Sequence, residues 1–157
     1  MPQLVKGGKH TFGWTRVGNT GRIRIPPEAL EEYQLQEAGK LLLIPGSRTS
    51  GGFALGAQEA VAQSQLGNLT DISHMLEESL TVEGELIEDK GRPYGWVVLR
   101  DGGVTIPAGT LARFGVETGG KLLVIRGSGL AVGFAVRGPI VEEALKHPEL
   151  LTFESDK

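Results

Sequence analysis

The chain has 157 residues, of which 39% are hydrophobic and 22% charged, and its formal net charge at pH 7 is −3. This composition is typical of a folded protein with one core or two small ones. No apolar run approaches about 18 residues, and the first residues lack the apolar core of a secretory signal, so we expect no membrane association. Because cysteine is absent, disulfides and thiolate sites are excluded, and a cytoplasmic location is expected.

Glycine and charge are both distributed unevenly along the chain. The 24 glycines punctuate short runs of valine, isoleucine and leucine, which predicts a mainly β protein with many turns. Residues 1–56 hold seven Lys and Arg against four Asp and Glu, residues 57–93 hold two against eight, and residues 94–157 hold seven against seven. We therefore expect an anionic partner to contact the first of these segments.

Residues 1–12 come first in the chain and contain Lys6, Lys9 and His10 but few apolar side chains. Two interpretations remain open for them. One is a frayed terminus, because terminal residues without apolar anchors are often poorly ordered. The other is a flexible basic arm of the kind that reaches along a nucleic-acid groove.

Residues 21–26 (GRIRIP) combine a glycine turn, a short alternating strand and a terminating proline. On such a strand Ile23 and Ile25 share one face, and Arg22 and Arg24 share the other. The pattern predicts a strand that is half core and half binding surface. Since proline pre-sets φ for a first helical turn, we expect a helical turn directly afterwards, over 27–33.

An internal repeat organises the rest of the chain. With a shift of 81 positions, residues 39–44 (GKLLLI) align with 120–125 (GKLLVI), and residues 52–55 (GFAL) align with 133–136 (GFAV). The same shift places Ile25-Pro26 on Ile106-Pro107, and residues 102–107 (GGVTIP) again combine a glycine turn, a short strand and a terminating proline. The chain is therefore a duplication.

Each repeat is expected to form a β-β-α-β-β unit followed by a helix. The expected elements are a tryptophan strand (14–17; 96–99), a short strand into Ile-Pro, a helical turn, a hydrophobic strand (41–44; 122–125), a strand containing Phe53 or Phe134, and a closing helix (57–66; 140–146). Four short strands cannot bury a tryptophan and a hydrophobic strand alone. We therefore expect the two units to interleave their hairpins into one closed barrel, an intrachain pseudo-dimer, with Trp14 and Trp96 as plugs.

The segments outside the units are assigned more simply. Residues 70–80 are expected to be helical, the acidic stretch 82–89 to lead into a linker or an edge strand, and residues 150–157 to be a loose tail. The expected organisation is a basic N-terminal arm (1–12), a first unit with its helix (13–67), a helical and acidic linker (68–93), a second unit with its helix (94–147) and a polar tail (148–157).

Residues 17–30 (VGNTGRIRIPPEAL), followed by 39–44, resemble the swapped-hairpin domain of AbrB/SpoVT-type transcription factors. The resemblance covers the first unit from about Trp14 to Leu55. It implies a mainly β fold with short helices, in which two units interlock into a swapped-hairpin β-barrel. The second unit keeps the scaffold but has Gly103 and Thr105 at the positions of Arg22 and Arg24. The tandem arrangement also resembles MraZ proteins, in architecture only.

In this family, basic residues near the first hairpin contact double-stranded DNA, and for this chain we expect contacts to the DNA phosphates. The DNA-binding residues expected from the resemblance and from local charge are Arg16, Arg22, Arg24, Lys6, Lys9 and Arg100. The predicted function is a DNA-binding transcriptional regulator that forms a homo-oligomer. Two alternatives remain open: the arginines are ordinary solvated strand residues, or the chain is a protein-interaction or oligomerisation module that does not bind DNA, including an antitoxin-like role with a protein partner.

No pattern indicates an enzyme, a cofactor or a metal. The glycine-rich residues 127–129 lack the Lys-Ser/Thr pair and the following helix of a phosphate-binding loop, so we interpret them as a turn. His10, His74 and His147 lie far apart in the sequence, without ligand spacing on one helix.

Overall fold

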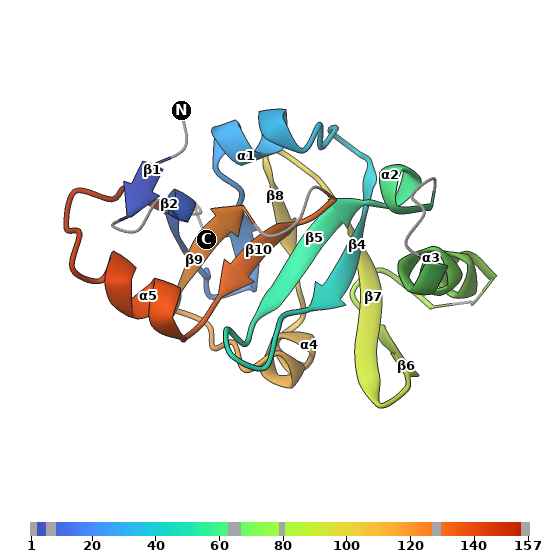
Figure 1. Ribbon diagram of the computed structural model, residues 1–157. Helices are drawn as coiled ribbons and strands as arrows, with labels where there is room; N and C mark the ends of the chain where they lie inside the picture. Colours follow the sequence, from blue (N-terminus) through green and yellow to red (C-terminus); the bar gives the residue numbers. More distant parts are fainter. Residues whose placement is uncertain (1–2, 6–8, 63–66, 79–80, 127–129, 155–157) are drawn as a thin grey trace.

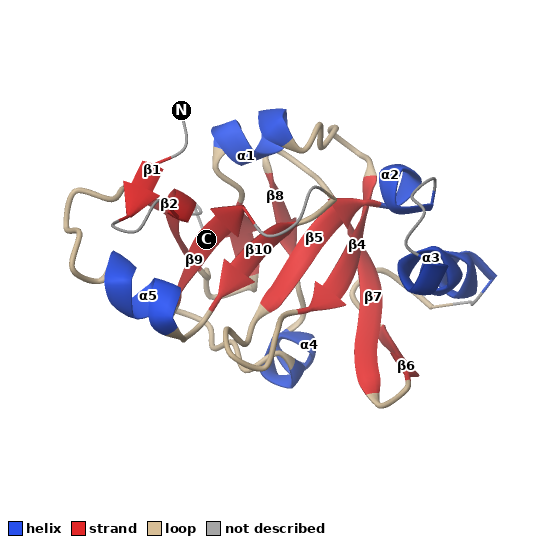
Figure 2. Cartoon of the chain, viewed as in Figure 1, coloured by secondary structure: helices blue, strands red, loops and turns tan. Residues whose placement is uncertain are grey.

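The computed structural model describes residues 3–5, 9–62, 67–78, 81–126 and 130–154, and it shows a mainly β protein with short helices (Figures 1 and 2). The strands are β1 (Gln3–Val5), β2 (Lys9–Arg16), β3 (Arg22–Arg24), β4 (Lys40–Pro45), β5 (Phe53–Ala57), β6 (Leu86–Asp89), β7 (Arg92–Val98), β8 (Gly103–Thr105), β9 (Lys121–Arg126), β10 (Val132–Ala135) and β11 (Thr152–Glu154). The helices are α1 (Pro27–Glu32), α2 (Gln58–Ala62), α3 (Gly67–Glu78), α4 (Ala108–Arg113) and α5 (Pro139–Ala144).

The strands of one repeat pair with those of the other. The first strand of each repeat pairs with the hydrophobic strand of the other repeat: β2 pairs with β9, and β7 pairs with β4. The registers match: Trp14 lies opposite Leu123, and Trp96 lies opposite Leu42. The strands β5 and β10 pair at the centre, and β3 pairs with β8 in a separate two-stranded sheet, here called the ribbon. Each repeat therefore completes its sheet with strands of the other.

A pseudo-twofold axis relates the two halves. Equivalent residues pair with each other at two places, Phe53 opposite Phe134 and Ile23 opposite Val104. The rings of Phe53 and Phe134 stack with their centroids 4.9 Å apart. All four side chains belong to one central cluster of buried residues, which lies between the ribbon and the inner face of the large sheet. The core is thus shared by both repeats rather than divided between them.

The sheet itself is open. Its nine strands run in the order β1-β2-β9-β10-β5-β4-β7-β6, with β11 paired to β2, and the described strands at its two ends do not meet. The closed barrel expected from the sequence is therefore not confirmed. The edge strand β6 lies within the acidic stretch 82–89 rather than after it, where a linker or an edge strand was expected.

The helical turns begin where the sequence places them. Pro26 and Pro107 precede α1 and α4 with φ values of −54° and −57°, which are compatible with a helix start. The helix expected over 57–66 is described as α2, with residues 63–66 outside the described part, and the helix expected over 70–80 begins earlier, in α3. Figure 1 shows α2 and α3 at one end of the sheet and α5 at the other.

The two tryptophans do not plug the central core, contrary to expectation. Trp14 packs with Leu123 and the α5 residues Val141 and Ala144 in a second cluster. Trp96 packs against a third cluster, which includes Leu42 and residues of α2 and α3. The reason is strand alternation: the neighbours of Leu123 in β9 point inward, so Leu123 and the tryptophan opposite it point outward. The tryptophans therefore anchor the helices that cover the outer face.

The tail expected to be loose also departs from expectation, because residues 152–154 form β11, which runs parallel to β2. The backbone N–H of Trp14 donates to the carbonyl of Leu151 at 2.8 Å, and Leu150 is buried beside Trp14. The segment is held by the buried Leu150 and by the backbone pairing of β11 with β2. Residues 155–157 lie outside the described part.

Candidate nucleic-acid interface

The ribbon displays the alternation predicted for residues 21–26. Ile23 and Ile25 are buried in the central core, whereas Arg22 is half-buried and Arg24 is exposed on the other face. Across the ribbon, Arg22 lies opposite Thr105 and Arg24 opposite Gly103. One strand of the ribbon therefore carries two arginines, and its pseudo-symmetric partner carries none.

Arg22 is held against the turn that precedes β8. Its Nη2 donates to the carbonyl oxygens of Arg100 and Asp101 at 2.6 and 3.1 Å. Gly103 is required first by the close pairing of the ribbon, because a Cβ there would lie 2.5 Å from the carbonyl oxygen of Ile23, and it would also lie 3.1 Å from the Arg22 Cζ. Gly103 thus stands at the position of Arg22 in the second repeat and allows β8 to approach β3 closely.

Arg24 has an ordered backbone and an uncommitted side chain. The hydroxyl of Thr15 donates to the carbonyl of Arg24 at 2.7 Å, which connects β3 to β2. Within the described part of the chain, no group forms a hydrogen bond or an ion pair with the Arg24 guanidinium. Its five N–H donors are therefore open to a phosphate at no cost in existing contacts.

Arg16 and Arg100 are instead engaged with carboxylates. Arg16 Nε lies 3.1 Å from Glu154 Oε1, and its Nη1 donates to the carbonyl of Gly119 at 3.0 Å. Arg100 Nη1 lies 2.9 and 2.8 Å from the two carboxylate oxygens of Glu83. A phosphate would have to compete with these partners, which reduces what either arginine offers to DNA.

The two lysines assigned to the basic arm have no described side chains. Lys6 lies outside the described residues, and Lys9 begins β2, where its backbone pairs with Val5. The charges around the ribbon are mixed, since Glu37 Oε2 accepts a hydrogen bond from the backbone N–H of Asp101 at 2.7 Å. The structure thus brings Arg22, Arg24 and Arg100 to the ribbon and its turn, with carboxylates beside them.

A second group of arginines was missed by the sequence analysis. Arg48, Arg113 and Arg137 line a cavity of about 390 Å³ beside the turn between β4 and β5, here called the basic cavity. They come from three segments that are distant in sequence. The repeat alignment was the only available signal, because it places Glu32 at the position of Arg113 and Gly56 at the position of Arg137.

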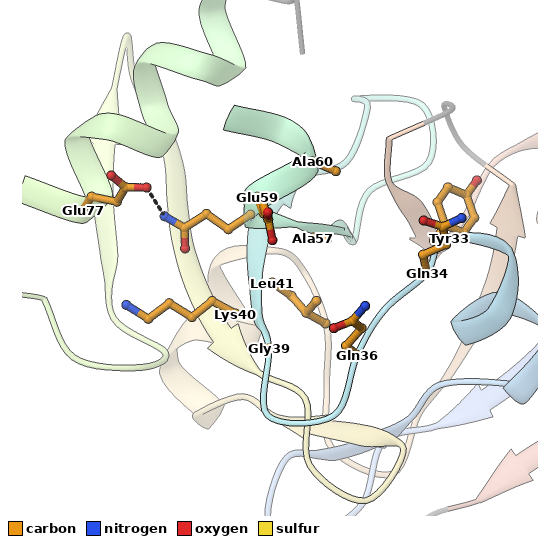
Figure 3. A pocket seen from close by; sticks show the side chains of 11 residues that line it. Tyr33, Gln34, Gln36, Gly39, Lys40, Leu41, Ala57, Glu59, Ala60 and Glu77 are labelled. Atoms are coloured by element: carbon orange, nitrogen blue, oxygen red, sulfur yellow. Dashed lines mark hydrogen bonds between the residues drawn. The ribbon is translucent and has the colours of Figure 1, made fainter. Parts of the chain in front are cut away.

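A larger cavity of about 750 Å³, with a mixed polar and apolar lining, lies between α2, α3, the start of β4 and the segment after α1 (Figure 3). Gln58 Nε2 donates to Glu77 Oε1 at 3.4 Å, and the Lys40 ammonium lies 4.6 Å from the centre of the Trp96 ring. Lys121 takes the equivalent place over Trp14, at 5.0 Å. Because the lysine–tryptophan contact recurs in both repeats, we interpret it as part of the scaffold rather than as a site.

Two features are absent from the described residues. None of their His, Cys, Asp and Glu side chains gather in a group of three or more that could hold a metal ion. No described helix is both long enough and apolar enough to cross a membrane. Comparison of the chain with protein-family models, with curated proteins and with solved structures finds no match.

Proposed function

We propose that this chain is a DNA-binding transcriptional regulator of the AbrB/SpoVT type, built as a swapped-hairpin pseudo-dimer within one chain. The proposal is supported by the exchange of strands between the repeats, in which β2 pairs with β9 and β7 pairs with β4. It is supported as well by the resemblance of residues 17–30 to that family. A cytoplasmic location, where bacterial-type regulators meet DNA, is part of the same proposal.

The observation that carries the proposal is the exposed face of β3. Ile23 is fully buried, so the strand cannot rotate, and Arg24 on its other face is exposed. The Arg24 guanidinium has no hydrogen-bond or ion-pair partner among the described residues. Cationic groups fixed on a rigid element at the centre of a pseudo-dimer are suited to contacting DNA phosphates.

The asymmetry of the ribbon suggests weak binding by a single chain. Gly103 and Thr105 replace two of the four arginines that a symmetric ribbon would carry, and Arg16 and Arg100 are paired with carboxylates. Two chains bound side by side would double the number of free cations. We therefore propose a homo-oligomer as the DNA-binding form.

Replacement of Arg24 by alanine tests the role of the ribbon. If the Arg24 guanidinium contacts one phosphate, Arg24→Ala reduces the slope of log K against log salt by about 0.9 for random duplex DNA. Lys146→Ala is the control, because Lys146 is an exposed cation on the outer side of the sheet, just after α5. Equal slopes for wild type and Arg24→Ala would remove Arg24 from the interface.

An interaction or oligomerisation module that does not bind DNA is the second candidate. It is favoured by an apolar cavity of about 290 Å³ on β5 and β10, lined by Ile44, Ala54, Ile125 and Ala131 among others. Exposed apolar surface of this kind is typical of contact with another protein. Under this candidate Ala54→Glu abolishes self-association or capture of a protein partner, whereas Arg24→Ala leaves both unchanged.

A further inference from the structure

The basic cavity collects positive charge from three parts of the chain. Arg48 lies in the turn between β4 and β5, Arg113 ends α4, and Arg137 follows β10. Arg92, at the start of β7, joins them, because its Nη2 donates to the carbonyl of Gly46 at 3.0 Å and Gly46 also lines the cavity. Four guanidinium groups therefore surround one turn.

The turn fixes two of these arginines in place. Arg137 Nη2 donates to the carbonyl of Arg48 at 3.1 Å, and the Arg137 guanidinium lies so close to Gly51 that a Cβ there would be 2.6 Å from Nη1. Arg92 is fixed by its bond to Gly46. Each of these contacts uses one N–H of a guanidinium that has five, so most donors stay available.

Negative charge near the cavity is insufficient to balance these groups. Arg113 Nη2 is paired with Glu88 Oε1, and Asp89 lies opposite Arg92 in the pairing of β6 with β7. Arg48 is exposed, and no group in the described part of the chain forms a hydrogen bond or an ion pair with its guanidinium. Like charges held close together destabilise one another, and a bound anion relieves that repulsion.

The duplicated scaffold does not require this concentration of charge. At the pseudo-equivalent end, Glu32 replaces Arg113 and binds Arg126 through both carboxylate oxygens, at 2.6 Å each. This hydrogen bond raises the pKa of Arg126. The same scaffold is thus neutralised at one end and left cationic at the other, which indicates a role for the cationic end beyond folding.

We propose that the basic cavity binds a compact phosphate-bearing small molecule. The planar forks of Arg48, Arg113 and Arg137 match the oxygen spacing of phosphate, which arginine binds in a bidentate manner. The volume of about 390 Å³ falls within the range of small-ligand sites. A hollow of this kind favours a compact anion over the convex backbone of a duplex. The proposal does not rest on the role of the ribbon in DNA binding.

Calorimetric titration with inorganic pyrophosphate, at constant ionic strength, tests the site. We expect the wild-type chain to bind pyrophosphate and Arg48→Ala to weaken binding by about tenfold or more, the loss typical of one charge-assisted contact. Arg113→Ala is the second variant, with a smaller expected loss, because Arg113 is already paired with Glu88. Arg24→Ala is the control, because Arg24 lies on the ribbon and does not line the basic cavity. The affinity of this variant for pyrophosphate should equal that of wild type. Thermal unfolding checks that each variant is folded.

Three results would overturn the proposal. The first is no pyrophosphate binding by the wild-type chain. The second is equal weakening by Arg48→Ala and Arg24→Ala, which would indicate general charge attraction. The third is duplex DNA binding that depends on Arg48 while pyrophosphate does not bind, which would assign the basic cavity to the nucleic-acid backbone. Absence of pyrophosphate binding would not change the salt dependence of DNA binding expected for Arg24→Ala. The proposal for the basic cavity and the proposal for the ribbon can therefore be refuted independently.

Discussion

The interlocking of the two repeats can be tested at a pair of equivalent glycines, Gly21 and Gly102. Both adopt positive φ, +84° and +75°, so alanine is strained at either position by about 1–2 kcal/mol. Their surroundings differ. A Cβ on Gly21 would lie 2.0 Å from the carbonyl oxygen of Ile106 in the other repeat, whereas a Cβ on Gly102 would meet nothing closer than 3.9 Å.

Gly21→Ala therefore lowers the free energy of unfolding by a second contribution, which Gly102→Ala lacks. To relieve the clash, β8 must move away from the turn, which breaks the bond from Ile106 N–H to the carbonyl of Gly21, now 3.0 Å long. The broken bond and the disturbed packing around Ile106 add about 2 kcal/mol, for a total of about 3–4 kcal/mol against about 1–2 kcal/mol for Gly102→Ala. This is a large part of the total stability of a typical domain.

Urea unfolding followed by tryptophan fluorescence measures the difference. We expect the midpoint for Gly21→Ala to fall well below that for Gly102→Ala, with similar m-values for both. In thermal unfolding the expected gap between the two variants is about 4–8 °C. If the two glycine variants lost the same stability, the close approach of the Gly21 turn to the second repeat would be refuted, and with it the cross-pairing of β3 with β8.

The remaining predictions concern the tail and the turn of the second repeat. Leu150→Ala should lower the free energy of unfolding by about 2–3 kcal/mol, because Leu150 is buried beside Trp14. Leu151→Ala, at the exposed neighbouring position, should lower it by less than about 0.5 kcal/mol. Equal losses in urea unfolding would contradict the docking of β11. Glu83→Gln should strengthen binding to duplex DNA, because it releases Arg100 from its carboxylate partner, whereas Glu142→Gln should have a smaller effect. Fluorescence anisotropy at low salt compares the DNA affinities of the two variants. An unchanged affinity for Glu83→Gln would show that Arg100 does not reach DNA.

The features that could be predicted from the sequence are those that local patterns or the repeat determine. The alternation around Ile23 and Arg24 fixed which face is buried, and Pro26 and Pro107 marked where α1 and α4 begin. The repeat implied that equivalent strands would pair across the two halves. Each of these three features follows from backbone geometry or from the duplication, and none of them depends on which distant side chains meet.

The features that could not be predicted depend on contacts between distant residues. Glu154 is 138 residues away from Arg16, and no pattern in the sequence indicates that they form an ion pair. The position of Trp14 depends on the register of β2 against β9, since a slip of one residue would turn the ring inward. The cluster of arginines at the basic cavity forms only after β10 and α4 reach the turn between β4 and β5.

The measurement that most directly tests the central proposal is the binding of wild-type chain to random duplex DNA by fluorescence anisotropy, from low to physiological salt. We predict measurable binding at low salt and a linear fall of log affinity with log salt, with a slope of about 0.9 for each phosphate contacted. Absence of binding at the lowest salt would contradict a DNA-binding function and favour the interaction module.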